Sequence, residues 1–204
     1  MARLLFTSRN FGSLDHPKNS DKAINLSRLI GNQLHFMNQS HGNQITVITN
    51  KSEADISVYE SDGLVTNQTN LALAVQVADC IPLLLLSKNV IAAVHVGRKG
   101  LLNQVAVNAV VEMNKLGAEQ ISGVVGPHIC GNCYEVDPQM FAQITKDYPA
   151  TAGKTNHLNL FAGLADQLKG IELKNLGICT KENVNYFSHR AYGEAGRQVG
   201  VISL

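Results

Sequence analysis

The sequence predicts a mixed α/β (α+β) domain in which mixed β-sheets are covered by helices. Apolar runs typical of buried strands lie at 71–78, 81–87 and 90–96. Apolar residues also recur at helical spacing, most clearly over 102–116. The length of 204 residues suits one ample domain, spanning 1–204, and is short for two.

The N-terminal part of the chain alternates strand and helix signals. A short apolar segment at 4–8 precedes a polar loop that carries proline and glycine. Asp21 is placed as an N-cap, and the apolar spacing after it predicts a helix over about 22–34. Short strands are expected within 36–42 and at 44–49, the first of which ends in a polar turn.

A connector at 51–59, which carries Asp55, and a turn at 61–63 lead to the central stretch of the chain. Two apolar runs there, 81–87 and 90–96, are separated by the polar pair Lys88-Asn89 and predict a hairpin.

This hairpin would place Pro82 opposite His95, with Cys80 as a diagonal neighbour of His95 on the same face. Such neighbours lie roughly 7–8 Å apart, so a thiolate and an imidazole could share one ion. Alternatively, both residues are ordinary buried core residues, because both types are often buried.

The remaining elements follow from the same signals. The helix over 102–116 would stop at Gly117, and further elements are expected as a strand at 121–125, helices at 137–146 and 158–169, and strands at 176–179 and 199–203.

Composition and charge narrow the class of protein. The formal net charge is +1 and no basic cluster is present, which argues against a nucleic-acid partner. The chain has no apolar stretch of about 18 residues and no N-terminal signal-peptide core, so we expect no membrane span and a cytoplasmic location. The four cysteines are then expected to be thiols or metal ligands.

Three residues are candidate metal ligands: His41, Cys80 and His95. Two histidines and a cysteine are a known zinc donor set, and three protein ligands leave one position open for water or substrate. A zinc ion in such a site lowers the pKa of bound water to about 7. Spacing alone does not show that His41 reaches the other two, and it equally fits a turn histidine beside Gly42.

Other motifs are less specific. Cys130 and Cys133 form a C-x-x-C pair, but a zinc knuckle needs a second pair and the sequence has no second C-x-x-C. A redox role would need the pair at a helix N-terminus, so a structural or incidental pair is favoured. Asp79 or Asp62 could orient a ligand histidine or act as a general base, although Asp62 fits an ordinary turn aspartate.

Two arginines stand close together near the C-terminus. Arg190 and Arg197 could bind a phosphate or carboxylate with their guanidinium forks, although an exposed surface arginine is the usual case.

Several separated motifs together resemble a known family. In chain order they are QSHGNQI, SDGLVT, LALAVQVADCIPLLL, AAVHVGRKG, VVGPHICGNCYEV and YFSHRAYGEAGRQVGVISL. This pattern resembles the bacterial laccase-domain, or multicopper polyphenol oxidase, proteins of the YfiH type, also known as purine nucleoside phosphorylases with adenosine deaminase activity. The resemblance implies the laccase-domain fold.

The resemblance also implies a site. The family's metal ligands fall on His41, Cys80 and His95. The implied cofactor is one zinc ion, with copper as the metal of the oxidase name. The implied reactions are phosphorolysis of adenosine, inosine, guanosine or methylthioadenosine to base and sugar 1-phosphate, and hydrolytic deamination of adenosine.

Further residues are assigned to this implied chemistry as expectations. Asp79 joins Cys80 and His95 as a catalytic group. The residues expected to bind substrate or phosphate are Gln39, Asn25, Arg190, Arg197 and Lys99. The expected partners are purine nucleosides and phosphate, and the expected state is a monomer or a small homo-oligomer.

The chain departs from the family pattern after H-x-G. Arg98 and Lys99 stand where the family has tryptophan and arginine, and the chain contains no tryptophan. Lys99 keeps the positive charge but not the bidentate fork. His189 also adds an imidazole to the motif that reads F-S-Y-R in the family.

Alternative functions use the same residues. A thiol hydrolase or amidase would use Cys80 as nucleophile and His95 as base, with cell-wall precursor editing as one role. A copper-dependent polyphenol oxidase fits less well, because only seven histidines are spread along the chain. A metal-binding protein without turnover is a third class.

Overall fold

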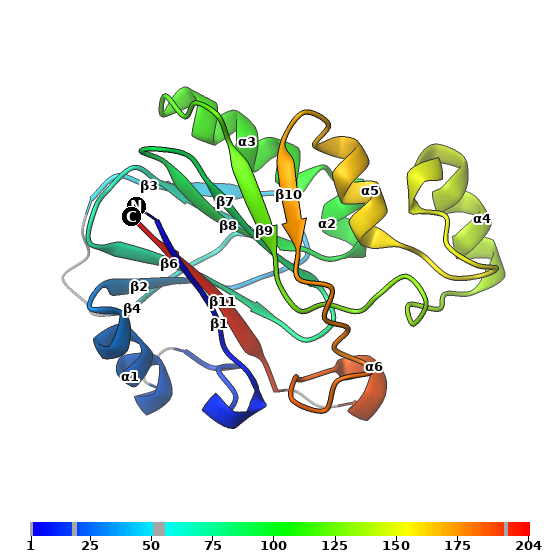
Figure 1. Ribbon diagram of the computed structural model, residues 1–204, viewed down its shortest axis with the longest axis horizontal. Coiled ribbons are helices and arrows are strands. Elements are labelled where there is room, and N and C mark those ends of the chain that lie inside the picture. The colour runs from blue at the N-terminus through cyan, green and yellow to red at the C-terminus, as the bar shows by residue number, and fades with distance from the viewer. Residues whose placement is uncertain (1, 18–19, 51–55, 194–195) are drawn as a thin grey trace.

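In a computed structural model of the chain, two mixed β-sheets pack face to face between helices (Figure 1). The structure describes residues 2–17, 20–50, 56–193 and 196–204. The predicted mixed α/β class is confirmed. Within the described residues, no helix is both long and apolar enough to cross a membrane.

The first sheet contains both ends of the chain. Its strand order is β1-β11-β6-β2-β4, with bounds β1 Arg3–Phe6, β11 Gln198–Ser203, β6 Leu71–Val77, β2 Gln33–Met37 and β4 Ile56–Tyr59. The strands β1, β11 and β6 are antiparallel neighbours, whereas β6, β2 and β4 run parallel. Arg3 pairs with Ser203, so the two ends of the chain lie side by side.

The second sheet carries the predicted hairpin. Its order is β10-β9-β7-β8-β5-β3, with bounds β10 Glu172–Asn175, β9 Ser122–Val125, β7 Ile81–Leu86, β8 Ile91–Val96, β5 Gly63–Thr66 and β3 Ile45–Ile48. In the antiparallel pair β7–β8, Pro82 is the partner of His95, as the sequence predicted.

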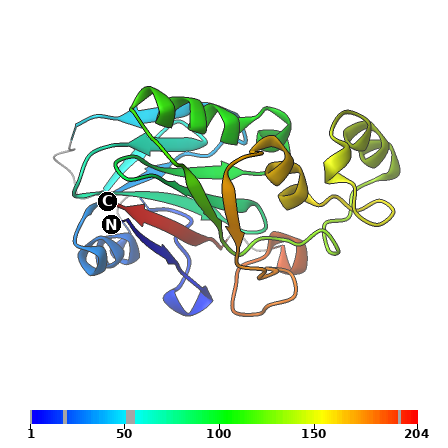
Figure 2. The same cartoon turned by 45° about the horizontal axis from the view of Figure 1, so that its top comes forward.

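Helices cover the outer faces of both sheets, as Figures 1 and 2 show. Helix α1 packs on the first sheet, and α2 and α3 pack on the second sheet. Helix α5 packs beside α2, and α4 lies beyond α5, away from the sheets. The helix bounds are α1 Asp21–Ile30, α2 Arg98–Leu102, α3 Val105–Lys115, α4 Pro138–Asp147, α5 Leu160–Gln167 and the short α6 His189–Tyr192.

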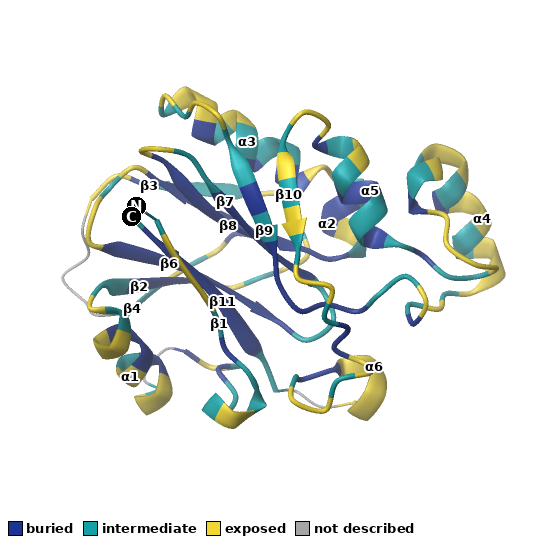
Figure 3. Ribbon diagram, in the orientation of Figure 1, coloured by how far each residue is buried: buried dark blue, intermediate teal, exposed yellow. Residues whose placement is uncertain are grey.

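The sequence of β6 shows how the layers are built. Its side chains alternate between faces, as in any strand. The large side chains of Leu71, Leu73 and Val75 pack against the second sheet, and the small Ala72 and Ala74 face the layer of α1. Both faces are buried, so β6 is apolar except at Gln76, near its end, and the strand is dark blue in Figure 3.

Several predicted boundaries were wrong. The helix predicted over 22–34 ends at Ile30, because Gly31 adopts a left-handed conformation with φ 74°. Leu34 therefore belongs to β2. The N-cap is Ser20 rather than Asp21. The helix predicted over 102–116 is interrupted at Gln104, which has φ 60°.

The short strands β4, β5 and β10 were the hardest to predict from the sequence. The strand predicted at 176–179 lies instead at Glu172–Asn175, whose polar pattern reflects an exposed sheet edge. Strand β5 follows directly from the predicted turn at 61–63, and β4 occupies the end of the predicted connector. Residues 51–55 of that connector, including Asp55, lie outside the described residues.

Candidate metal centre

Three ligand candidates from different segments converge at one end of the two sheets. His41 follows β2, Cys80 precedes β7, and His95 lies near the end of β8. The Nε2 atom of His41 is 3.9 Å from the Sγ atom of Cys80. One ligand atom from each of the three residues lies within 4.8 Å of the other two. The three residues are therefore placed to share one ion.

Cys80 reaches this position because the chain crosses between the sheets immediately before it. Strand β6 belongs to the first sheet and β7 to the second, and only 78–80 connects them. Asp79 adopts φ 89°, a conformation that L residues rarely adopt. The sharp turn brings the thiol to the edge where the two sheets meet.

Asp79 is held on both sides of its carboxylate. Its Oδ1 atom accepts a hydrogen bond from Thr180 Oγ1 at 2.7 Å, and its Oδ2 atom accepts one from the backbone N–H of Arg190 at 2.7 Å. Its carbonyl oxygen accepts a hydrogen bond from the N–H of Ile129 at 2.9 Å. These contacts tie two distant loops to the residue before Cys80.

Asp62 is the carboxylate that contacts the candidate ligands. It is fully buried, and its Oδ1 atom lies 2.8 Å from Nδ1 of His95. Its two oxygens also accept hydrogen bonds from the loop that carries His41, from Ser40 N, Ser40 Oγ, His41 N and Gly42 N. With Nδ1 of His95 occupied, Nε2 is the nitrogen that remains for a metal.

The electrostatics favour a charged cluster. Burial would raise the pKa of Asp62, but hydrogen bonds from His95 and Gly42 lower it to about 2. Burial also opposes ionisation of Cys80, yet its contacts with His41 and His95 lower its pKa to about 6. Burial lowers the pKa of His95, and Asp62 and Cys80 together raise it to about 9. Without a metal, these contacts favour the thiolate form of Cys80 and the protonated form of His95.

Gly97 leaves the space in which the ligands meet. A Cβ atom at this position would lie 3.0 Å from Sγ of Cys80 and 3.0 Å from Cδ2 of His41. Its backbone is extended, with φ −82° and ψ 177°, so the glycine is required for space rather than for conformation. The donor set and this space fit a single small ion.

A cavity of about 540 Å³ opens onto the three ligands. That volume lies in the range of small-molecule sites, roughly 300–1,000 Å³. Its lining residues combine apolar and polar side chains: Asp15, His16, Pro17, Met37, Asn38, Gln39, His41, Val58, Gln76, Val77, Ala78, Cys80, His95 and Arg197.

The expected substrate-binding residues divide into two groups. Gln39 and Arg197 line the cavity. The Gln39 side chain also donates to the carbonyl of Gln76 at 2.7 Å and accepts from its N–H at 2.9 Å, which fastens the end of β2 to β6. Asn25 lies on α1 and Lys99 is exposed on α2, and neither lines this cavity.

Arg190 lies beside Tyr134 instead. Its guanidinium carbon is 5.4 Å from the centre of the Tyr134 ring, and its Nη1 atom donates to the carbonyl of Glu135 at 2.8 Å. Burial raises the pKa of Tyr134, and the neighbouring Arg98 guanidinium opposes that rise. Tyr134 and two arginines thus form a second polar group outside the cavity lining.

Sequence reasoning missed two features of the site. It favoured a turn aspartate for Asp62, whose contacts come from loops distant in sequence. It also did not single out Tyr134. The one available signal for Asp62 was its place in the SDGLVT motif.

Comparison with protein families gives one match over nearly the whole chain. Residues 6–204 match the family described as multi-copper polyphenol oxidoreductase laccase. A Corynebacterium glutamicum protein named purine nucleoside phosphorylase is 34% identical over 218 residues, covering 98% of this chain and 88% of the relative. A Streptomyces coelicolor protein of the same name is 37% identical over 180 residues, covering 83% of this chain and 74% of the relative.

Solved structures share the fold. A Neisseria meningitidis protein superposes with a TM-score of 0.84 at 24% identity, covering 100% of this chain and 94% of that one. The Bacillus licheniformis hypothetical protein YfiH gives a TM-score of 0.84 at 22% identity, covering 100% and 92%.

Proposed function

This chain belongs to the family described as multi-copper polyphenol oxidoreductase laccase, and from that premise we propose that it is a zinc-dependent purine nucleoside phosphorylase. The proposed substrates are adenosine, inosine, guanosine or methylthioadenosine together with phosphate. The products would be the free base and the sugar 1-phosphate. Support comes from the names of the relatives and from the chemistry of the site.

The observation that carries the proposal is the position of the three candidate ligands. His41, Cys80 and His95 all line the cavity of about 540 Å³, and Arg197 lines the same cavity. A metal ion held by the three ligands and the Arg197 guanidinium, which could bind an anionic substrate, would thus face the same cavity.

Zinc is proposed because the donor set and the space suit it. Tetrahedral zinc places nitrogen at about 2.0–2.1 Å and sulfur at about 2.3 Å, which needs only a small contraction of the 3.9 Å separation between His41 and Cys80. When bound, the ion would act as a Lewis acid at an open fourth position. Asp62 would hold the His95 ring in the orientation for binding.

Within the cavity, Arg197 is the preferred phosphate ligand. It lines the same space as the candidate metal ligands, whereas Arg190 and Lys99 do not. A guanidinium can bind two phosphate oxygens at once. The apolar side chains of Met37 and Val77 would pack against the nucleoside.

Asp79 is proposed as a positioning residue rather than a catalytic one. Both of its carboxylate oxygens accept hydrogen bonds from Thr180 and from the N–H of Arg190. It would act by holding Cys80 in place.

Hydrolytic deamination of adenosine is part of the proposal. It would need water activated at the same centre and a group that transfers a proton to the leaving amine.

The experiment is a phosphorolysis assay with product identification. Inosine and phosphate should yield hypoxanthine and ribose 1-phosphate, with no base released when phosphate is omitted. Arg197→Met should raise the KM for phosphate at least about tenfold, which corresponds to about 1.4 kcal/mol. Arg28→Met, on the exposed face of α1, is the matched control. Base release that is independent of phosphate would contradict phosphorolysis.

A second function is favoured by one specific observation. The contacts run from Cys80 to His95 and from His95 to Asp62, which is the arrangement of a nucleophile, a base and a carboxylate that orients the base. A thiol hydrolase using them would resist chelators and lose activity on alkylation of Cys80. A zinc enzyme would lose activity to chelators and regain it with zinc, and elemental analysis would distinguish zinc from copper.

A further inference from the structure

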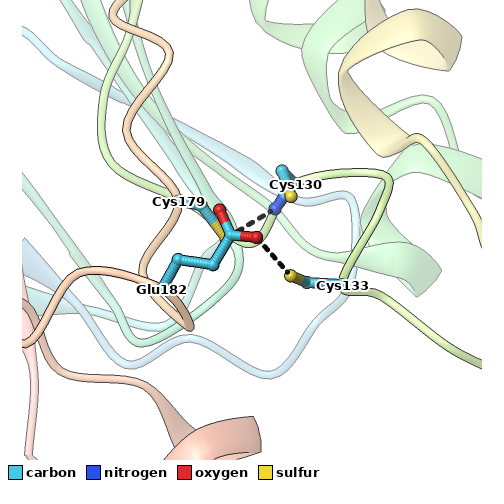
Figure 4. Close-up of side chains that lie close together, drawn as sticks. All are labelled: Cys130, Cys133, Cys179 and Glu182. Atoms are coloured by element: carbon cyan, nitrogen blue, oxygen red, sulfur yellow. Dashed lines mark hydrogen bonds between the residues drawn. The ribbon is translucent and has the colours of Figure 1, made fainter.

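A second cluster of metal-binding side chains lies apart from the cavity, and Figure 4 shows it. Cys130, Cys133, Cys179 and Glu182 each offer one ligand atom, and these four atoms lie within 4.8 Å of one another. None of the four lines the cavity of the first centre.

The cluster is built from two similar turns. Cys130 and Cys133 flank a turn after β9, in which the N–H of Cys133 donates to the carbonyl of Cys130 at 3.0 Å. Cys179 and Glu182 flank a turn after β10 and have the same spacing in the sequence as Cys130 and Cys133. The second segment therefore supplies a second pair of ligands, in which a glutamate takes the place of the second cysteine of a C-x-x-C motif.

The two turns already contact each other through their candidate ligands. The Sγ atom of Cys133 donates to Oε1 of Glu182 at 3.2 Å, and the N–H of Cys130 donates to Sγ of Cys179 at 3.4 Å. These contacts join residues 49 positions apart in the sequence. Cys133 and Cys179 are buried and Cys130 is half-buried, whereas Glu182 faces solvent.

We propose that Cys130, Cys133, Cys179 and Glu182 bind a second, structural zinc ion. Three thiolates and one carboxylate supply four donors of the kinds that zinc accepts, and four protein ligands close the site as in structural zinc centres. Tetrahedral zinc–sulfur bonds of about 2.3 Å place sulfur atoms somewhat under 4 Å apart, so a modest contraction of the cluster is sufficient.

A redox role for Cys130 and Cys133 fits the surroundings less well. Redox-active C-x-x-C pairs lie at a helix N-terminus, which lowers the pKa of the attacking thiol. Here the next helix, α4, begins at Pro138 with Asp137 as its N-cap, beyond the C-x-x-C turn. Cys133 also faces a carboxylate, which does not favour a thiolate unless a cation lies between them.

The second ion would stabilise one wall of the first centre. Ile129, next to Cys130, donates its N–H to the carbonyl of Asp79, and Thr180, next to Cys179, donates its hydroxyl to the Asp79 carboxylate. Asp79 precedes Cys80. Joining the two turns through zinc would therefore hold the backbone that presents the Cys80 thiol.

The test is zinc stoichiometry in protein whose first centre has been removed. The triple variant His41→Ala, Cys80→Ala, His95→Ala is purified under reducing conditions, incubated with Zn²⁺, separated from free ion and analysed for metal. Wild type should bind two zinc ions per chain and the triple variant one. Adding Cys133→Ser and Cys179→Ser should remove the remaining ion.

Two further measurements keep the test independent of folding and of catalysis. Co²⁺ in the triple variant should show strong thiolate charge-transfer absorption, since three sulfurs ligate it. Glu182→Gln changes an exposed side chain and should weaken zinc binding at least about tenfold, a loss of about 1.4 kcal/mol, with Glu119→Gln as the control.

Two outcomes would overturn the second site. The folded triple variant, with circular dichroism like that of wild type, would bind no zinc above background. Alternatively, intact mass would show two hydrogens lost to a Cys130–Cys133 disulfide in protein isolated without air. Neither outcome depends on phosphorolysis, so this result and that of the proposed function are separable.

Discussion

At the scale of single residues, the candidate centre depends on side chains that position the ligands as much as on the ligands. Asp62 accepts hydrogen bonds both from His95 and from the loop of His41, so one buried carboxylate orients two of the three ligands. The sequence proposed the three candidate ligands and named Asp62 only as one of two carboxylates that could orient a histidine, because its five donors come from two segments far from it in sequence.

Asp62→Asn should weaken both metal binding and the fold. An amide group would point N–H donors at the N–H groups of Ser40 or Gly42, which need acceptors. We expect zinc affinity to fall about 10–100-fold and the free energy of unfolding to fall by about 1–3 kcal/mol. Chelator competition and urea denaturation measure the two effects. Glu60→Gln, an exposed carboxylate nearby, is the control, and unchanged zinc affinity in Asp62→Asn would contradict the role.

Gly97→Ala should remove metal from the first centre without unfolding the chain. The new methyl group would lie 3.0 Å from both Cys80 Sγ and His41 Cδ2, and the ligands would have to separate. We expect one zinc ion fewer per chain by elemental analysis, with the thermal midpoint lowered by only a few degrees.

Gly170→Ala is the matched control for that substitution. It introduces strain at φ +91° but meets no atom within 4 Å, and it lies away from the ligands. Loss of zinc from Gly170→Ala, or full zinc in Gly97→Ala, would show that crowding at the ligands is not the cause.

At the scale of elements, the hairpin was predictable and the crossing before it was not. The polar pair between two apolar runs located the β7–β8 turn, and the strand period then placed Pro82 opposite His95. The positions of His41 and of the β6–β7 crossing depend on which sheet each strand joins, and apolar runs carry no such information. For His41, only the family resemblance pointed to the observed position.

Asp79→Ala should destabilise the crossing. The substitution removes the acceptors for Thr180 and for the N–H of Arg190 and leaves alanine at φ 89°. We expect the free energy of unfolding to fall by about 2–4 kcal/mol, measured by urea denaturation. Asparagine adopts this backbone conformation more readily and keeps one acceptor oxygen, so Asp79→Asn should lower the free energy of unfolding by about half as much.

The asparagine variant also separates positioning from catalysis. If Asp79 only positions Cys80, Asp79→Asn should keep its zinc and retain turnover within about tenfold of wild type. A folded, zinc-loaded Asp79→Asn protein with turnover reduced more than about 100-fold would instead make Asp79 a catalytic acid or base.

At the scale of the whole molecule, the two sheets and the helices on their outer faces form four layers, and some polar groups are deeply buried between them. His35 on β2 is fully buried, with Nδ1 3.1 Å from the hydroxyl of Tyr59. The sequence did not predict that His35 lies on a strand covered on both faces, because the strand in this region was expected within 36–42, after His35. Burial lowers the pKa of His35 below its usual value.

This burial predicts a pH-dependent contribution to stability. As the pH falls through the usual range of histidine, the unfolded chain takes up a proton at His35 more readily than the folded protein does, so stability is lost. Relative to His35→Gln, wild type should lose more unfolding free energy between pH 7 and pH 5, up to about 2 kcal/mol. Urea denaturation at both values measures the difference, with His189→Gln on exposed α6 as the control. Equal pH slopes for wild type and His35→Gln would contradict it.

The central claim, that one metal ion at His41, Cys80 and His95 supports phosphorolysis, is tested most directly by returning zinc to metal-free protein. Chelated wild type should have no inosine phosphorolysis. Activity should return in proportion to zinc and should stay absent in His41→Ala, Cys80→Ala and His95→Ala at any zinc concentration. Full turnover by metal-free wild type, or by His41→Ala, would contradict the claim and assign the chemistry to Cys80 and His95 alone.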